Sequence, residues 1–224
     1  MFYYDETMLV LLPGLLLGMY AQWKVSAAFK EGKNKICKRG MSGKDVAREL
    51  LDTNGLHSVS IEPINSGDHY DPQSKTVRLE LQNYHGNDLT SVAVAAHEVG
   101  HAIQHQLSYT PLTLRSAFTP VVNLSNQMSM PLFFLGMILS LPFLVNLGIL
   151  LFALTVSFYL ITLPVEYNAS RRAMAMLSDH GYVNSEELPT VKKILDAAAL
   201  TYVSATITAI LSFARLLLLR KRRN

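Results

Sequence analysis

The chain has one cysteine among its 224 residues, so no disulfide can form within it. Its soluble part therefore needs no oxidising compartment. The cysteine, Cys37, stands among the basic residues Lys35, Lys38 and Arg39. A lone cysteine in a metalloprotein invites interpretation as a ligand, but in this basic surrounding we interpret it as incidental.

Charge is also scarce. Charged residues make up 17% of the chain, against about a quarter in soluble proteins, and half of the residues are apolar. Residues 7–23 and 116–165 carry no charge at all. The net charge of +3 is too small to indicate a nucleic-acid partner, and the basic residues flank the apolar segments, where they set membrane topology. The sequence predicts an integral membrane protein, mainly α, whose partner is the lipid bilayer.

Four transmembrane helices are expected from the apolar segments. Acidic residues precede the first and lysines follow it, which predicts a retained anchor with its N-terminus outside. Pro142 and residues 146–148 should break the long middle segment into a hairpin of helices 2 and 3. We therefore expect a first span at 7–23, a soluble domain at 24–115, a hairpin at 117–164, a cytoplasmic helical segment at 165–196 and a fourth span at 197–219.

The soluble domain should be small and of α+β type. Ser42, with Asp45 three residues later, predicts a helix N-cap. Residues 59–64 and 76–81 alternate between apolar and polar, and turn residues lie at 71–75, which predicts a hairpin or a small sheet. The strand at 76–81 could bind an extended peptide at its edge, or it could be purely structural.

The motif that carries chemistry is H-E-V-G-H at residues 97–101. The apolar spacing around it predicts a helix from about 88–91 to about 107, on which His97 and His101 share one face. This is the HExxH pattern, in which zinc takes both histidines and Glu98 acts on the metal-bound water. His105 continues the ladder, but a straight helix cannot bring three successive turns onto one tetrahedral ion, so we interpret it as a flanking residue.

A catalytic zinc ion takes three protein ligands and leaves one position open. Glu166 is the first charged residue after the uncharged stretch 116–165, which includes the predicted hairpin. We predict that it is the third ligand, returned to the metal helix by the hairpin. The alternative is an interfacial anchor.

One family resembles the chain over nearly its whole length, on three stretches: H-E-V-G-H-A-I-Q-H, the strand region D-H-Y-D-P-x-S-K-T-V-R-L and the later L-P-V-E-Y-N-A-S-R-R-A. It is the neutral zinc metallopeptidases of bacterial membranes, the YugP-like proteins, which are more distantly similar to HtpX-like and CAAX prenyl proteases. The resemblance implies a zincin-like domain of the gluzincin type, one Zn²⁺ per chain held by His97, His101 and Glu166, and catalysis by Glu98. The distant relatives usually carry an aspartate four residues after the ligand glutamate. Ser170 stands there in this chain, and Asn168 is the alternative support for a histidine.

The predicted activity is hydrolysis of a peptide or a membrane-protein substrate. Residues of suitable type to stabilise the oxyanion are His180, Tyr202, Tyr70 and Arg171, and the sequence does not choose among them. For Tyr202 the alternative is helix packing, and for His180 it is a surface loop. Two other functions stay open: a membrane adaptor or assembly factor with a structural metal, and a zinc hydrolase of a non-peptide amide or ester.

Topology follows from the basic residues. Eleven of them flank the spans beside the soluble part: Lys24, Lys30, Lys33, Lys35, Lys38, Arg39, Arg115, Arg171, Arg172, Lys192 and Lys193. The positive-inside rule therefore predicts that the active site of this multi-pass protein faces the cytoplasm. The resemblance implies that the membrane is the plasma membrane of a bacterium. If 197–219 spans, the basic tail 220–223 lies outside; otherwise the segment bends and returns its end inward.

Overall fold

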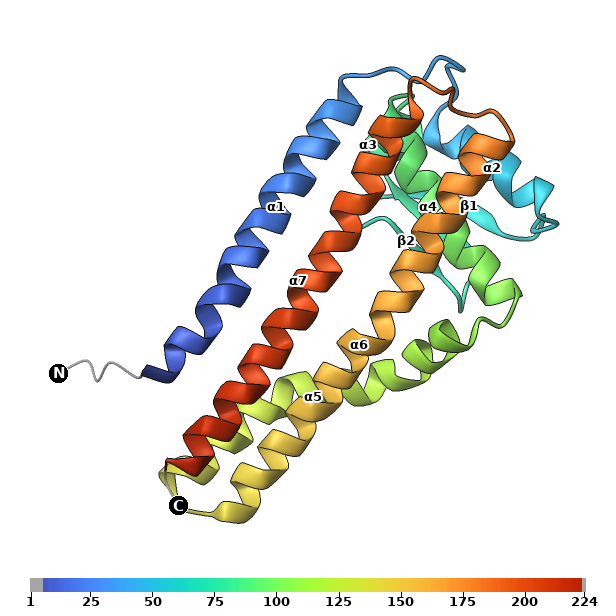
Figure 1. The fold of residues 1–224 in the computed structure, drawn as a ribbon. Coiled ribbons are helices and arrows are strands. Elements are labelled where there is room, and N and C mark those ends of the chain that lie inside the picture. Colours follow the sequence, from blue (N-terminus) through green and yellow to red (C-terminus); the bar gives the residue numbers. More distant parts are fainter. Residues whose placement is uncertain (1–5, 223–224) are drawn as a thin grey trace.

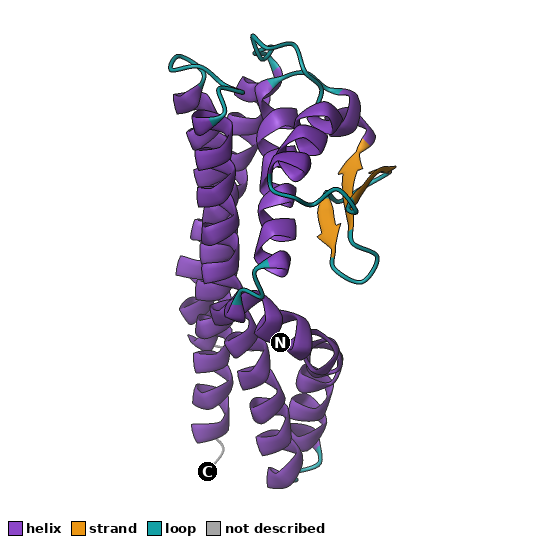
Figure 2. Ribbon diagram, turned by 90° about the vertical axis from the view of Figure 1, so that its right-hand side faces the viewer, coloured by secondary structure: helices purple, strands orange, loops and turns teal. Residues whose placement is uncertain are grey.

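The computed structural model describes residues 6–222, which are mostly helical. Asp5, which is one of the acidic residues before the first apolar segment, and Arg223 of the basic tail lie outside the described residues. In chain order the elements are η1 (Glu6–Leu11), α1 (Leu12–Lys33), α2 (Gly43–Thr53), β1 (Ser60–Ile64), β2 (His69–Asp71), β3 (Thr76–Glu80), α3 (Leu81–His85), α4 (Leu89–Gln106), α5 (Thr110–Ile138), α6 (Pro142–Asp179) and α7 (Leu188–Lys221). Helices α1, α6 and α7 run along the long axis (Figure 1), and the sheet lies to one side of the upper half (Figure 2).

Three stretches of the described residues are long and apolar enough to cross a membrane: Glu6–Lys33, Pro142–Asp179 and Leu188–Lys221. Helix α5 is not among them, although it is 29 residues long. It contains two internal prolines, and Asn123, Asn126 and Gln127 on it are exposed. Three candidate spans are therefore found where four were expected.

Helices α5 and α6 form a hairpin whose turn lies at residues 139–141, so the break predicted at Pro142 is confirmed. The contribution to this break expected from residues 146–148 is wrong, because those residues continue α6. Gly148 serves packing instead: a Cβ there would lie 2.7 Å from the backbone nitrogen of Phe133. The glycine thus allows the two helices to approach closely.

The small sheet has the strand order β1-β3-β2. β1 pairs with β3 in parallel, and β2 pairs with β3 in antiparallel orientation. A small sheet was expected, but a hairpin between 59–64 and 76–81 is wrong, because the intervening chain supplies a third strand that takes the turn at 72–75. β3 is therefore the central strand with no free edge, and β2 is an edge strand.

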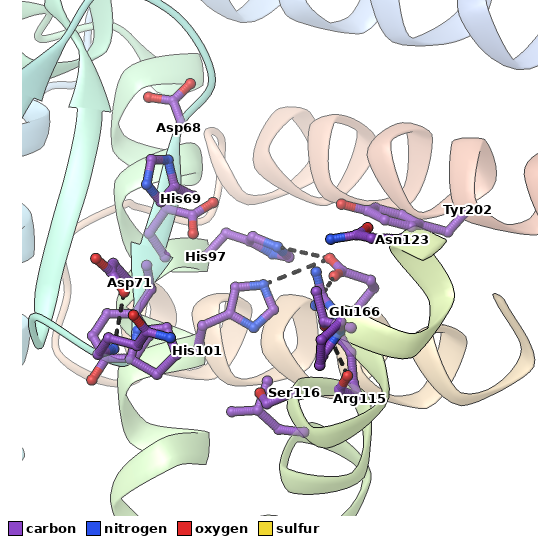
Figure 3. A pocket seen from close by; sticks show the side chains of 17 residues that line it. Asp68, His69, Asp71, His97, His101, Arg115, Ser116, Asn123, Glu166 and Tyr202 are labelled. Carbon is purple, nitrogen blue, oxygen red and sulfur yellow. Dashed lines mark hydrogen bonds and ion pairs between the residues drawn. The ribbon is translucent and has the colours of Figure 1, made fainter. Parts of the chain in front are cut away.

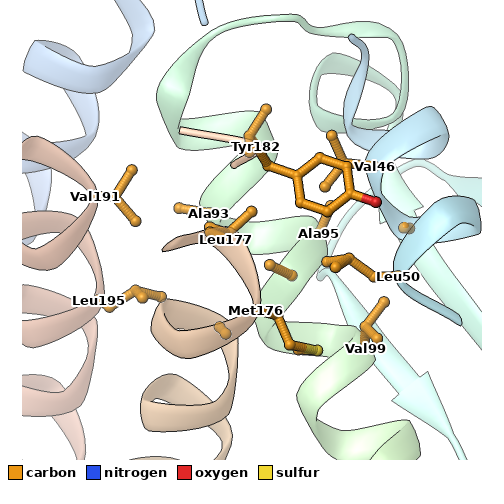
Figure 4. Close-up of a cluster of buried hydrophobic side chains, with 14 of the residues drawn as sticks. Val46, Leu50, Ala93, Ala95, Val99, Met176, Leu177, Tyr182, Val191 and Leu195 are labelled. Carbon is orange, nitrogen blue, oxygen red and sulfur yellow. The ribbon is translucent and has the colours of Figure 1, made fainter. Parts of the chain in front are cut away.

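The main core lies between α4, α2, the C-terminal half of α6 and the N-terminal half of α7 (Figure 4). Val46 and Leu50 of α2 pack in the same cluster as Val99 of α4 and Leu177 of α6. The predicted N-cap is confirmed, since Ser42 and Asp45 form a reciprocal capping box at the start of α2. Helix α4 is nearly all buried, as the apolar flanks of the motif predict.

Cys37 belongs to this core and not to a metal site. Its side chain is 1% exposed, and its Sγ donates to the carbonyl of Tyr182 at 3.3 Å. Burial raises the pKa of the thiol above its ordinary value. The structure therefore agrees with interpreting Cys37 as a packing residue.

Helices α4 and α6 approach each other closely at Gly100, inside the H-E-V-G-H motif. A Cβ at Gly100 would lie 2.8 Å from the carbonyl oxygen of Ala169, a residue of α6 with no exposed surface. No side chain can occupy this position unless one helix moves. The residue at position 100 therefore decides how near α6 lies to the histidines.

We predict that Gly100→Ala destabilises the protein. Alanine normally stabilises a helix by about 1 kcal/mol relative to glycine, but overpacking against a backbone carbonyl costs about 1–3 kcal/mol. The midpoint of thermal unfolding in detergent should fall. Gly18→Ala is the matched control, because its Cβ would meet nothing within 4 Å, and its midpoint should not fall. A midpoint for Gly100→Ala at or above that of the wild type would contradict the tight contact.

Candidate metal centre

Two helices bring three metal-ligand side chains together. His97 and His101 come from α4, Glu166 comes from α6, and their ligand atoms all lie within 4.8 Å of one another. Glu166 Oε2 is 3.3 Å from His97 Nε2 and 3.6 Å from His101 Nε2 (Figure 3). Two imidazole nitrogens and one carboxylate oxygen are the donor set of a catalytic zinc site with an open fourth position. The side chains present therefore fit a zinc ion.

His101 is oriented by a buried glutamine. His101 Nδ1 is 2.9 Å from the Oε1 of Gln104, and Gln104 Nε2 donates to the carbonyl of Val165 at 2.8 Å and to Asn168 Oδ1 at 3.0 Å. Because the amide oxygen only accepts, Nδ1 of His101 carries the proton and Nε2 is free to bind a metal. This role of Gln104 was not predicted from the sequence, although its place three residues after His101 on a buried helix was an available signal.

His97 is supported by Ser170, whose Oγ is 3.2 Å from His97 Nδ1. Ser170 thus contacts a histidine from the position where the distant relatives have aspartate. Asn168, the alternative, reaches His101 only through Gln104 and also accepts a hydrogen bond from Arg172.

The electrostatics of His101 reflect its neighbours. Burial alone lowers the pKa of His101, but hydrogen bonding to the Glu166 carboxylate offsets this effect, and the pKa lies above its ordinary value. A metal ion at Nε2 must therefore compete with a proton, so metal binding at this nitrogen is coupled to pH.

Glu98 lines the same cavity but is not part of the ligand group. Its residue is only 6% exposed, yet its carboxylate makes no hydrogen bond or ion pair with any residue between 6 and 222. Among the described residues no fully buried side-chain oxygen or nitrogen lacks a hydrogen-bond partner, so the carboxylate oxygens of Glu98 are open to the cavity, where water can reach them. The Glu98 carboxylate therefore faces the cavity beside the metal-ligand group.

The cavity has a volume of about 600 Å³ and is bounded by β2, α4, α5, α6 and α7. Of the four residues considered for the oxyanion, Tyr70 and Tyr202 line it. The other two do not: Arg171 lines a separate cavity with Lys192, and His180 ends α6, where its carbonyl accepts from Arg39. Arg115, which the sequence analysis used only for topology, does line the cavity and donates to Glu166 Oε1 at 2.8 Å.

His105 lies outside the metal-ligand group, as expected for a flanking residue. Its Nδ1 is 2.9 Å from the hydroxyl of Tyr70, so it ties β2 to α4. The residues of β2 line the cavity, and β2 pairs only with β3 among the described strands. The strand edge available to an extended peptide is therefore β2 and not the 76–81 strand proposed from the sequence.

Comparisons with known proteins identify the family to which this chain belongs. Residues 7–221 match the model of a family described as "putative neutral zinc metallopeptidase". The "putative membrane protease YugP" of Bacillus subtilis (strain 168) is 42% identical over 205 residues, which cover 91% of each chain. No solved structure matches the chain.

We predict that the purified protein binds about one zinc ion per chain and that His101→Ala and Glu166→Ala each abolish this binding. Two remaining protein ligands are too few to compete with water. His105→Ala and Glu62→Ala are the controls, because neither residue belongs to the ligand group, and both should keep the zinc. The measurement is the zinc content of each variant after dialysis, determined by atomic emission. Loss of zinc from His105→Ala equal to that from His101→Ala would contradict the ligand set.

Proposed function

Because this chain belongs to the family described as "putative neutral zinc metallopeptidase", we propose that it is a membrane-embedded zinc peptidase that cleaves peptide bonds. In this proposal His97, His101 and Glu166 hold the zinc ion and Glu98 is the general base. The observation that carries it is the Glu98 carboxylate, which opens into the same cavity as the metal-ligand group and makes no hydrogen bond or ion pair within residues 6–222.

When bound, zinc supplies a Lewis acid that activates water and polarises the scissile carbonyl. Glu98 accepts the proton of the attacking water and returns it to the leaving amine. The developing oxyanion needs a further hydrogen-bond donor, for which Tyr70 and Tyr202 are placed in the cavity. Tyr70 is already bonded to His105, so the hydroxyl of Tyr202, which lies beside Glu166 in Figure 3, is the better candidate.

The substrate class proposed is an extended peptide segment, free or part of a membrane protein. The edge of β2 provides unpaired backbone groups along the cavity, which can pair with such a segment. A sheet beside the metal helix, together with a glutamate as third ligand, supports a zincin-like domain of the gluzincin type.

Two rival functions are less well supported. A structural metal in an adaptor favours four protein ligands and no base, whereas three ligands, Glu98 and an open cavity are found. A hydrolase of a non-peptide amide or ester would use the same groups, and the family description favours peptides.

We predict that Glu98→Gln keeps the zinc and loses peptidase activity by about 100-fold or more, because the amide preserves shape but cannot accept the proton. Cleavage of a peptide library by detergent-purified protein, with and without chelator, provides the assay. Glu62→Gln, a change on the sheet, should leave cleavage intact. Near-normal turnover by Glu98→Gln would rule out its role as base.

The position of the metal centre along the helices supports cleavage at the membrane surface. Helices α1 and α7 are in contact at Gly14 with Thr208 and at Gly32 with Ile194. Tyr202 lies between these contacts, near the level where α1 changes from uncharged residues to the exposed Trp23 and to Lys24. Tryptophan and lysine are typical of the membrane–water interface. We therefore place the metal centre at that interface.

We also propose that α5 crosses the bilayer with α6, as a fourth span. α6 is about 57 Å long at 1.5 Å per residue and begins at the end of the bundle remote from the metal centre. α5 must cover the same depth to reach that turn. Its polar residues Asn126 and Ser125 explain why composition alone does not identify it: Asn126 accepts from Thr155 of α6, and Ser125 donates to the carbonyl of Val121.

The proposed orientation puts the metal centre in the cytoplasm of a bacterial cell, as the eleven basic residues favour. α7 continues without a break from Leu188 to Lys221, and Arg222 pairs with Glu6 at 2.9 Å. The start of α1 and the end of α7 therefore lie at one end of the bundle. This supports a translocated basic tail and not a last segment that bends back.

We predict that a membrane-impermeant maleimide labels cysteines at positions 139 and 221 in intact cells but not one at position 66, all in a Cys37→Ser background. Leu139 is in the α5–α6 turn, Lys221 ends α7 and Ser66 is exposed in the soluble part. Permeabilised cells, in which all three should react, are the control. External labelling at position 66 would reverse the orientation.

A further inference from the structure

We propose that Arg115 is a positioning residue of the metal centre: it holds one carboxylate oxygen of Glu166 so that the other is presented to the metal. This inference rests on the zinc site of the proposed function and extends it to a residue on α5, a helix that contributes no ligand. It also makes the position of α5 part of metal binding.

The two oxygens of Glu166 have separate neighbours. Arg115 Nη1 donates to Oε1 at 2.8 Å, whereas Oε2 lies 3.3 Å from His97 Nε2 and 3.6 Å from His101 Nε2 (Figure 3). A carboxylate that is free to turn could offer both oxygens to one ion. Because the guanidinium occupies Oε1, Glu166 offers only Oε2 on the histidine side, which leaves the remaining position for water.

Charge gives Arg115 a second role. The Glu166 side chain is only 2% exposed, and a buried carboxylate is costly without a cationic partner. Among the lysines and arginines of residues 6–222, Arg115 is the one that pairs with it. Arg171 and Arg172, although close in sequence to Glu166, do not: Arg172 donates to Asn168, and Arg171 lines another cavity.

The contact between Arg115 and Glu166 links two distant parts of the chain. Arg115 and Glu166 are 51 residues apart and lie on the two helices of the α5–α6 hairpin. The ion pair therefore holds the N-terminal part of α5 against Glu166, the residue of α6 that belongs to the metal-ligand group. Partners that orient a metal ligand typically change metal affinity by about 10- to 100-fold when they are removed.

The test measures metal binding alone, on the full-length protein in detergent, by competition between the protein and a chromophoric zinc chelator. Arg115→Gln should bind zinc about 10- to 100-fold more weakly than the wild type. Arg115→Lys should fall between the two, because lysine keeps the charge but not the planar geometry. Arg171→Gln is the matched control: it removes an equal charge near Glu166 without a contact, and its affinity should not change.

A spectroscopic readout separates positioning from general destabilisation. Cobalt(II) substituted for zinc reports coordination through its visible absorption, which weakens as the coordination number rises. If Arg115 confines Glu166 to one oxygen, Arg115→Gln should give a weaker and shifted cobalt spectrum, and Arg115→Lys should restore part of the wild-type spectrum. Should the glutamine variant fail to fold, the lysine variant decides by the same two measurements.

Wild-type affinity together with a wild-type cobalt spectrum in the folded Arg115 variant would overturn the inference. That result would leave the zinc peptidase proposal standing. Absence of zinc binding by the wild-type protein would instead refute the proposed metal site itself. Since no peptide is used, a lack of peptidase activity does not affect the outcome.

Discussion

The close contact between α4 and α6 at Gly100 is the constraint on which the rest of this structure depends. Gly100 lies between His97 and His101 in sequence, and it faces the backbone of Ala169, three residues after Glu166. Because no side chain separates the helices there, the carboxylate can reach between the two imidazole rings. The surrounding core, in which α2 and α7 pack on α4, stabilises the position of α4. Ligand residues on two rigid helices are thereby positioned more precisely than loops would allow.

Two buried glutamates have different environments in one cavity, and the difference assigns their roles. Glu166 is surrounded by His97, His101 and Arg115, groups that favour a carboxylate fixed in place. Glu98 makes no hydrogen bond or ion pair within residues 6–222 and faces the cavity, as a group that exchanges a proton with water must. In the proposed mechanism the same residue type serves as ligand in one setting and as base in the other, a division that protein environments commonly produce.

Local patterns were more reliable than pairings across the chain. The capping box at Ser42, the limits of the metal helix and the break before Pro142 all agree with the structure, because each depends on residues within one or two turns. Of the two arrangements expected for 59–64 and 76–81, the small sheet is found and the hairpin is wrong: β1 pairs with β3 in parallel, and alternation identifies a strand but not its direction. For the same reason the edge strand β2, only three residues long, was not recognised.

By itself, the sequence determined the pair His97 and His101, because positions four apart on a helix share a face whatever the rest of the chain does. It also determined Glu98 beside them, and pointed to Glu166 through the requirement for a third ligand. Only the tertiary structure brought Glu166 to His97 across 69 residues, placed Gln104 and Ser170 behind the histidines and put Arg115 on the other oxygen of Glu166. Such contacts depend on how helices cross, and no local spacing encodes that, because packing at Gly100 and along the α5–α6 hairpin sets the distances.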